Sequence, residues 1–105
     1  MVKKRCHRLP WKQYDVFGTT VTIEDGRSTE PDRDGTCPNR FYAAWADLGN
    51  GRELLRGHIE RVPLAGSGAT YHMRAYREEA GYGGLRGAVE HLLTVNRTHR
   101  AGREA

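Results

Sequence analysis

The 105-residue sequence has no uninterrupted apolar segment approaching the roughly 20 residues that a membrane-spanning helix needs. Its first residues, MVKKRCHRLPWK, are basic and lack the apolar stretch of a secretory signal peptide. These absences predict a soluble, cytoplasmic protein with no membrane partner.

Cysteine is also scarce. Cys6 and Cys37 are the only two, they lie in polar surroundings, and a cytosolic protein normally keeps such residues as thiols. A zinc site would have to combine them with His7 and one of His58 or His72. Structural zinc prefers repeated ligand pairs about two to four residues apart, and only Cys6-His7 approaches that spacing. We therefore predict no disulfide, no metal and no cofactor.

Residues that could support catalysis are present but not grouped. Ser28 and Ser67 both lie in loop-like sequence outside any nucleophile motif. The adjacent carboxylates of Glu78 and Glu79 would point to opposite sides of a strand, and His91 falls on the polar side of a helical stripe. We predict that the protein is not an enzyme and that it has no catalytic residue, and the sequence identifies no small-molecule substrate.

Hydrophobic residues make up only 37% of the chain, so the core must be thin. The segment from Tyr14 to Glu24 is rich in β-branched and aromatic residues, which predicts one strand with a bulge at Gly18. From there to Arg40, turn-forming and charged residues predominate, and residues 25–40 are predicted to form a long polar loop.

Asn50-Gly51 is the preferred sequence of a two-residue hairpin turn, because both central positions of that turn need a positive φ. It predicts that residues 41–48 pair with residues 53–62. A helix is the alternative for the second arm, since Leu54, Leu55, His58 and Ile59 also fit a helical stripe, although Gly57 favours the strand.

Residues 64–69 are predicted to be a connector, and the alternation from Thr70 to Glu78 predicts another strand. Apolar residues then recur at spacings of three and four from Leu85, which predicts a one-sided helix ending near Thr98. The predicted fold class is α+β, with an antiparallel sheet of three to four strands packed against one C-terminal helix. Residues 1–105 are predicted to form a single domain, with a basic N-terminal arm (1–13), the polar loop (25–40) and a flexible tail (99–105).

The segment AGYGGLRGAVEHLL, residues 80–93, places glycines and Arg86 ahead of the helix. Backbone N–H groups at a helix start, together with an arginine, favour an anion. Gly84-Leu85-Arg86-Gly87 also resembles the GXXG clamp of KH domains, which implies that Gly84 and Gly87 let a nucleic-acid backbone approach. The alternative is a plain strand-to-helix bend in which glycines supply unusual φ angles.

The predicted order of three strands and a helix resembles the arm-binding domains of tyrosine recombinases and the AP2 type of plant DNA-binding domain. The resemblance implies a sheet that enters the major groove and arginines that reach phosphates or guanine edges. In its arginine, glycine and alanine usage the chain resembles small orphan proteins of high-GC actinobacteria and their bacteriophages, which implies an accessory protein that acts by binding.

The net charge of +4 is concentrated at both ends of the chain. We predict a small binding protein that contacts nucleic acid through a basic face. The residues predicted to make this contact are Lys3, Lys4, Arg5, Arg8, Lys12, Arg56, Arg74, Arg86, Arg97 and Arg100.

The alternative is a phage-type inhibitor or adaptor that binds a host protein through a sheet face or edge. Aromatic residues and arginine dominate the energetics of protein interfaces. Trp45, Tyr71 and Tyr76 are the interface residues that this alternative predicts.

Overall fold

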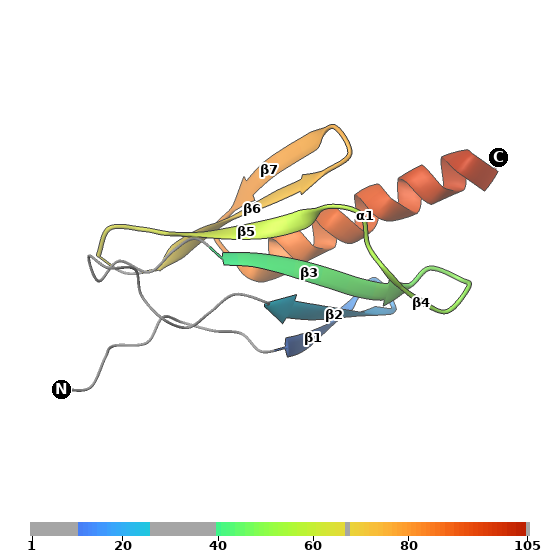
Figure 1. Cartoon of the computed structure of the whole chain (residues 1–105), viewed down its shortest axis with the longest axis horizontal. Coiled ribbons are helices and arrows are strands. Elements are labelled where there is room, and N and C mark those ends of the chain that lie inside the picture. The colour runs from blue at the N-terminus through green and yellow to red at the C-terminus, as the bar shows by residue number, and fades with distance from the viewer. Residues whose placement is uncertain (1–10, 26–39, 67, 105) are drawn as a thin grey trace.

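The computed structural model describes residues 11–25, 40–66 and 68–104 (Figure 1). Within these residues, seven strands precede one helix. The elements are β1 (Trp11–Val16), β2 (Thr19–Asp25), β3 (Arg40–Asp47), β4 (Arg52–Leu54), β5 (His58–Pro63), β6 (Ala69–Ala75), β7 (Glu78–Tyr82) and α1 (Leu85–Glu104).

All the strand pairs are antiparallel, and the sheet order is β1-β2-β3-β5-β6-β7. The short strand β4 is off this path and pairs only with β3. The α+β fold class is confirmed, but the prediction of three to four strands is wrong. Each of two predicted strands is a hairpin, and a third is divided into β4 and β5.

The first of these hairpins replaces the single bulged strand predicted from Tyr14 to Glu24. Val16 and Thr19 are register partners, so the chain reverses at Phe17-Gly18. Both turn residues have positive φ, 50° and 78°, as a two-residue turn of this hand requires. Consequently Trp11 to Gln13, predicted as part of a basic arm, belong to the edge strand β1.

The second unpredicted hairpin joins β6 to β7. Ala75 and Glu78 are partners across the turn Tyr76-Arg77, so the strand predicted to end at Glu78 ends at Ala75. Tyr76 has a φ of 56°, and its ring stacks on that of His99 with centroids 3.6 Å apart.

The predicted hairpin at Asn50-Gly51 exists, but its turn is longer than two residues. Asp47 and Arg52 are the last partners, which leaves residues 48–51 as the loop. The Asp47 carboxylate accepts hydrogen bonds from the backbone N–H groups of Gly49 at 2.7 Å and Gly51 at 3.2 Å. This side-chain cap stabilises the wider loop.

The second arm of that hairpin is a strand rather than a helix, but it is interrupted. Residues 55–57 separate β4 from β5. The last residues of β3 pair with β4, and the first residues of β3 pair with β5. The helix also differs from its predicted bounds: it continues past Thr98 to Glu104, so residues 99–104 are helical rather than a flexible tail.

Helix α1 covers one face of the sheet (Figure 1). The core contains alternate residues of the central strands and the apolar stripe of α1. Its fully buried members include Val21, Ile23, Tyr42, Ala44, Ala46, Ile59, Met73, Ala88, Val89, Leu92 and Leu93. Burial of this apolar area is the main force holding helix to sheet.

Both edge strands are also bonded to the helix. On β1, the backbone carbonyl of Asp15 accepts a hydrogen bond from Arg86 at 2.8 Å. On β7, Tyr82 and Glu78 hydrogen-bond the two ring nitrogens of His91, at 2.7 Å and 3.1 Å. The first turns of α1 are therefore bonded to both edge strands of the sheet.

Candidate binding surface

The face of the sheet opposite α1 has no secondary-structure element of the described chain against it. Successive side chains of a strand point to opposite faces, so residues that alternate with the buried set face away from the helix. We call this surface the open sheet face. Its large apolar and charged members are Asp15, Glu24, Phe41, Trp45, Asp47, Arg52, Leu54, His58, Glu60, Val62, His72, Arg74 and Glu79.

Trp45 lies at the centre of one half of the open sheet face. Its indole Nε1 donates a hydrogen bond to the Glu24 carboxylate at 3.3 Å, and the Arg52 guanidinium lies 5.4 Å from its ring centroid. The same three residues line a shallow depression of about 220 Å³. Leu54, the register partner of Trp45, is 52% exposed, so apolar surface extends beyond the depression.

A second depression, of about 200 Å³, lies over β5, β6 and β7. Arg74 donates two hydrogen bonds to the Glu79 carboxylate, at 3.1 Å and 2.6 Å. His58 and His72 also line it, and the His58 ring packs edge-on against Phe41 with centroids 5.3 Å apart. This half of the face is polar, with its charged side chains paired.

Within the described strands, the open sheet face is net acidic. Arg52 and Arg74 are its only arginines there. Against them stand five carboxylates: Asp15, Glu24, Asp47, Glu60 and Glu79. Such a surface attracts cations and disfavours the close approach of phosphates.

Six of the cations predicted to contact nucleic acid are described by the structure, and they are not gathered on this face. Among these six, Arg74 alone lies there, paired with Glu79. Arg86 bonds β1 and lies 3.7 Å from Glu90, and Arg97 donates to the Thr19 hydroxyl. Lys12 lies on the other face, 5.0 Å from the Tyr14 ring.

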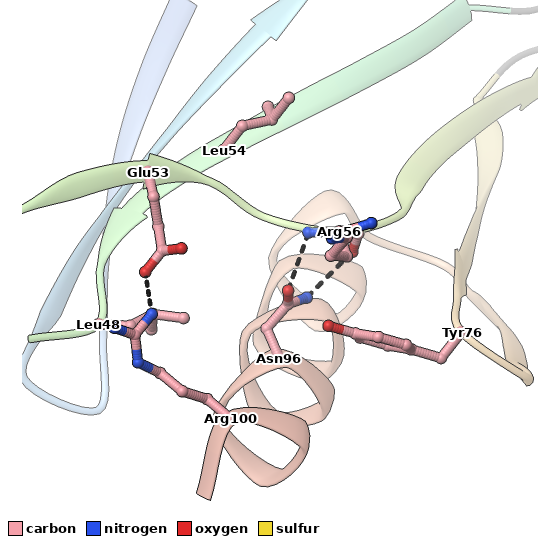
Figure 2. Close-up of a pocket in the computed structure, with 7 residues that line it drawn as sticks. All are labelled: Leu48, Glu53, Leu54, Arg56, Tyr76, Asn96 and Arg100. Carbon is pink, nitrogen blue, oxygen red and sulfur yellow. Dashed lines mark hydrogen bonds and ion pairs between the residues drawn. The ribbon is translucent and has the colours of Figure 1, made fainter. Parts of the chain in front are cut away.

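Arg56 and Arg100 line a separate cleft of about 310 Å³ between the β4–β5 loop and α1 (Figure 2). Arg100 forms an ion pair with Glu53 there. Figure 2 shows Tyr76 lying across the cleft with its hydroxyl toward Asn96. Arg56 is exposed, whereas Arg100 is held by its ion pair with Glu53.

Four predicted contact residues, Lys3, Lys4, Arg5 and Arg8, lie outside the described residues, as do the two cysteines. The predicted polar loop, 25–40, is described only at its ends, where Asp25 belongs to β2 and Arg40 to β3.

The glycines of the predicted backbone clamp have different surroundings. Gly84 immediately precedes α1, while Gly87 lies inside it, and neither has a φ in the left-handed region. A Cβ at Gly87 would lie 2.9 Å from the Tyr82 ring. The bend therefore needs Gly87 for close packing and not for an unusual φ.

Of the predicted interface aromatics, only Trp45 lies on the open sheet face. Tyr71 is on the helix-covered side and partly buried, and Tyr76 is in the β6–β7 turn. The prediction passed over Leu54, whose place opposite Trp45 becomes visible only when the hairpin register is known.

No helix in the described part of the chain is long and apolar enough to span a membrane. Neither a protein-family model, nor a curated protein, nor a solved structure matches this chain.

Proposed function

We propose that this protein binds another protein through the open sheet face, and that the docking surface of the partner is basic. The observation that carries the proposal is the position of Trp45 and the half-exposed Leu54 within a surface of five carboxylates and two arginines. The proposal corresponds to the inhibitor or adaptor that the sequence predicts as the alternative to a nucleic-acid-binding protein.

The composition of the face suits a protein interface. Tryptophan and arginine are enriched among residues that carry binding energy, and Trp45 is already held by Glu24 and Arg52. A side chain that is fixed before binding loses less conformational entropy when the partner docks. The surrounding carboxylates would speed the encounter with a basic surface and reject an acidic one.

Nucleic-acid binding remains a prediction that rests on the basic residues 3–12 at the start of the chain. The described cations support it less well. Arg74, Arg86, Arg97 and Arg100 each have a partner within the protein, and releasing an arginine from its carboxylate opposes any gain from a phosphate.

A photo-reactive residue placed on the open sheet face tests the proposal. Leu54→p-benzoylphenylalanine would be irradiated in nuclease-treated extract of the cell in which the protein acts. Thr94→p-benzoylphenylalanine, on the exposed side of α1, is the matched control. We expect one protein adduct from position 54 and none from position 94.

Charge reversal then tests whether the adduct depends on the acidic surface. Glu24→Lys and Glu60→Lys should each reduce its yield about tenfold, a change of about 1.4 kcal/mol in binding. Glu90→Lys, which alters net charge equally on the helix, should leave the yield unchanged. Two results would show that the open sheet face is not the docking site. One is that position 54 forms adducts only with nucleic acid, seen when the nuclease is omitted, and the other is an equal yield from all the charge variants.

A further inference from the structure

A buried arginine and a half-buried arginine lie opposite each other on neighbouring strands, on the side of the sheet covered by α1. Arg40 of β3 and Arg61 of β5 are register partners. Each is two residues from a core residue of its own strand, Tyr42 and Ile59, so both point to the inner face. Arg40 is 1% exposed. Like charges placed directly opposite each other in a sheet repel, and burial strengthens the repulsion.

Part of this charge is neutralised by Asp25 at the end of β2. Its carboxylate lies 3.3 Å from Arg40 Nη1, and both side chains are buried. Two guanidinium donors remain: Arg40 Nη2 and Arg61 Nε are buried and have no hydrogen-bond partner among the residues that the structure describes. A buried donor without a partner is unfavourable, and more so when it is charged, so native proteins rarely retain one without a reason.

Two tyrosines complete the group. Tyr42 follows Arg40 by two residues on the same strand and is 1% exposed, and Tyr71 is the register partner of Arg61 on β6. Burial, and then the neighbouring charge of Asp25, raise the pKa of Tyr42 to about 12, with smaller effects from Tyr71, Arg61 and Arg40. The Tyr42 hydroxyl thus keeps its proton at neutral pH and can donate a hydrogen bond.

We call these residues the buried arginine cluster: Asp25, Arg40, Tyr42, Arg61 and Tyr71. We propose that the buried arginine cluster binds a phosphate-type oxyanion, held by the two unpartnered guanidinium N–H groups and the tyrosine hydroxyls. The ligand is either free phosphate or the phosphoryl group of a larger molecule.

The chemistry of the group matches an anion rather than a cation. Guanidinium groups present planar N–H forks that fit the oxygen atoms of a phosphate. Two guanidinium charges against one carboxylate leave a net charge of +1, which a bound anion would neutralise. Asp25 would then orient Arg40 by holding Nη1 and leaving Nη2 free. This site lies on the opposite side of the sheet from the open sheet face, and it does not depend on the proposed function.

Thermal unfolding and calorimetric titration with inorganic phosphate, at constant ionic strength maintained with chloride, test the proposal. Phosphate should raise the Tm of the wild-type chain in a saturable manner, because a ligand that binds only the folded state stabilises it. Arg61→Gln should weaken phosphate binding about tenfold or more, as expected when a charged hydrogen bond is lost. Arg74→Gln removes the same charge from the open sheet face and should change the affinity less than about twofold.

Tyr71→Phe provides a second test that does not alter charge. It removes only a hydroxyl from a partly buried ring, so the fold should persist while the affinity for phosphate falls several-fold. Phenyl phosphate in place of phosphate distinguishes the two sources: tighter binding would indicate the phosphoryl group of a larger ligand, and weaker binding would indicate the free ion. Absence of a saturable Tm increase, or equal affinity in Arg61→Gln and wild type, would overturn the proposal.

Discussion

The side-chain amide of Asn96 on α1 holds both backbone polar groups of Arg56 in the loop between β4 and β5. Its Oδ1 accepts from the Arg56 N–H at 2.8 Å, and its Nδ2 donates to the Arg56 carbonyl at 3.0 Å. The Nδ2 also donates to the Leu92 carbonyl at 2.8 Å. One buried side chain thereby fixes the interruption between two strands against the helix (Figure 2).

Replacement of this amide should strongly destabilise the fold. Asn96→Leu has nearly the same size but leaves the Arg56 N–H and carbonyl without partners, at roughly 1 to 3 kcal/mol for each unsatisfied group. We expect the free energy of unfolding to fall by about 2 to 4 kcal/mol in urea denaturation. Thr94→Ala, whose hydroxyl bonds only the Glu90 carbonyl on its own helix, should change it by less than about 0.5 kcal/mol. A similar loss in both variants would contradict the bridging role.

Gly57, beside this loop, is required for two reasons that can be separated. Its φ is 100°, and a Cβ there would lie 2.4 Å from the Arg74 carbonyl oxygen. Gly51 has a similar φ of 92° but nothing within 4 Å of the corresponding Cβ. We expect Gly51→Ala to lower stability by about 1 kcal/mol through φ strain alone, and Gly57→Ala to lower it by more than about 3 kcal/mol because the backbone must move. Comparable losses in thermal unfolding would show that crowding at β6 is unimportant.

Because Gly87 packs closely against Tyr82, we expect Gly87→Ala to change stability in the direction opposite to that usual for a helix. In a helix interior Gly→Ala ordinarily stabilises by about 1 kcal/mol. Here the new methyl group would meet the Tyr82 ring at 2.9 Å, and that ring is held by its hydrogen bond to His91. We expect Gly87→Ala to destabilise by about 1 kcal/mol.

A double-mutant cycle isolates this contact. In a Tyr82→Ala background, Gly87→Ala should recover its ordinary stabilising effect, because the ring is no longer there. Measurement of all four variants by urea denaturation gives the coupling energy. A coupling near zero would mean that the glycine is present for a reason other than the tyrosine.

How much of the fold could be predicted from sequence depends on whether a signal was local. The spacing of Leu85, Val89 and Leu92 predicted the helix correctly, since a helical stripe is visible within a single segment. Its end was placed too early because the last turns carry polar residues, and Arg97 and Arg100 bond Thr19 and Glu53 far away in sequence. Long-range partners of this kind extend a helix beyond its apolar pattern.

The two missed hairpins have turns that sequence rules do not recognise. Those rules look for Asn-Gly or Asp-Gly, whereas Phe17 and Tyr76 are aromatic residues with positive φ, a conformation unusual for bulky side chains. Tyr76 gains a stacking contact with His99, while Phe17 is 65% exposed. Tertiary contact therefore explains one turn and not the other.

This difference predicts opposite effects of the same substitution. Phe17→Asn places the preferred asparagine before Gly18 and should stabilise the protein by about 0.5 to 1 kcal/mol. Tyr76→Asn relieves similar strain but removes the ring from His99, and should be neutral or destabilising. Thermal unfolding of the two variants in parallel measures the difference, and stabilisation of both would show that the stacked pair contributes nothing.

The candidate surface could be predicted less well than the fold. Trp45 and Arg74 were identified by residue type, but their neighbours depend on the register of the strands. A shift of one residue in register moves every side chain of a strand to the opposite face of the sheet. The pairing of Arg40 with Arg61 is likewise invisible in sequence, because it joins residues from two strands across the interruption at residues 55–57. Sequence supplied the residue types, and strand pairing supplied the surface and the buried arginine cluster.

The raised pKa of Tyr42 predicts a loss of stability in alkali. In the unfolded chain this phenol ionises near its ordinary pKa of 10.0, whereas in the folded chain burial holds its pKa at about 12. Between these values the unfolded state binds fewer protons than the folded state, so stability is fully present below pH 10 and falls as pH rises. From about pH 9 to about pH 12, wild type should lose about 2 kcal/mol more than Tyr42→Phe, since one pKa unit corresponds to about 1.4 kcal/mol.

Urea denaturation at a series of pH values measures this difference. Tyr76→Phe is the control, because Tyr76 is 38% exposed and is not part of the hydrophobic core of the described residues. Its stability should follow that of wild type throughout the series, while the Tyr42→Phe curve is flatter. Parallel curves for all three proteins would show that the Tyr42 hydroxyl ionises as readily in the folded chain as in the unfolded one. In that case burial beside Asp25 would not hold the proton on this phenol.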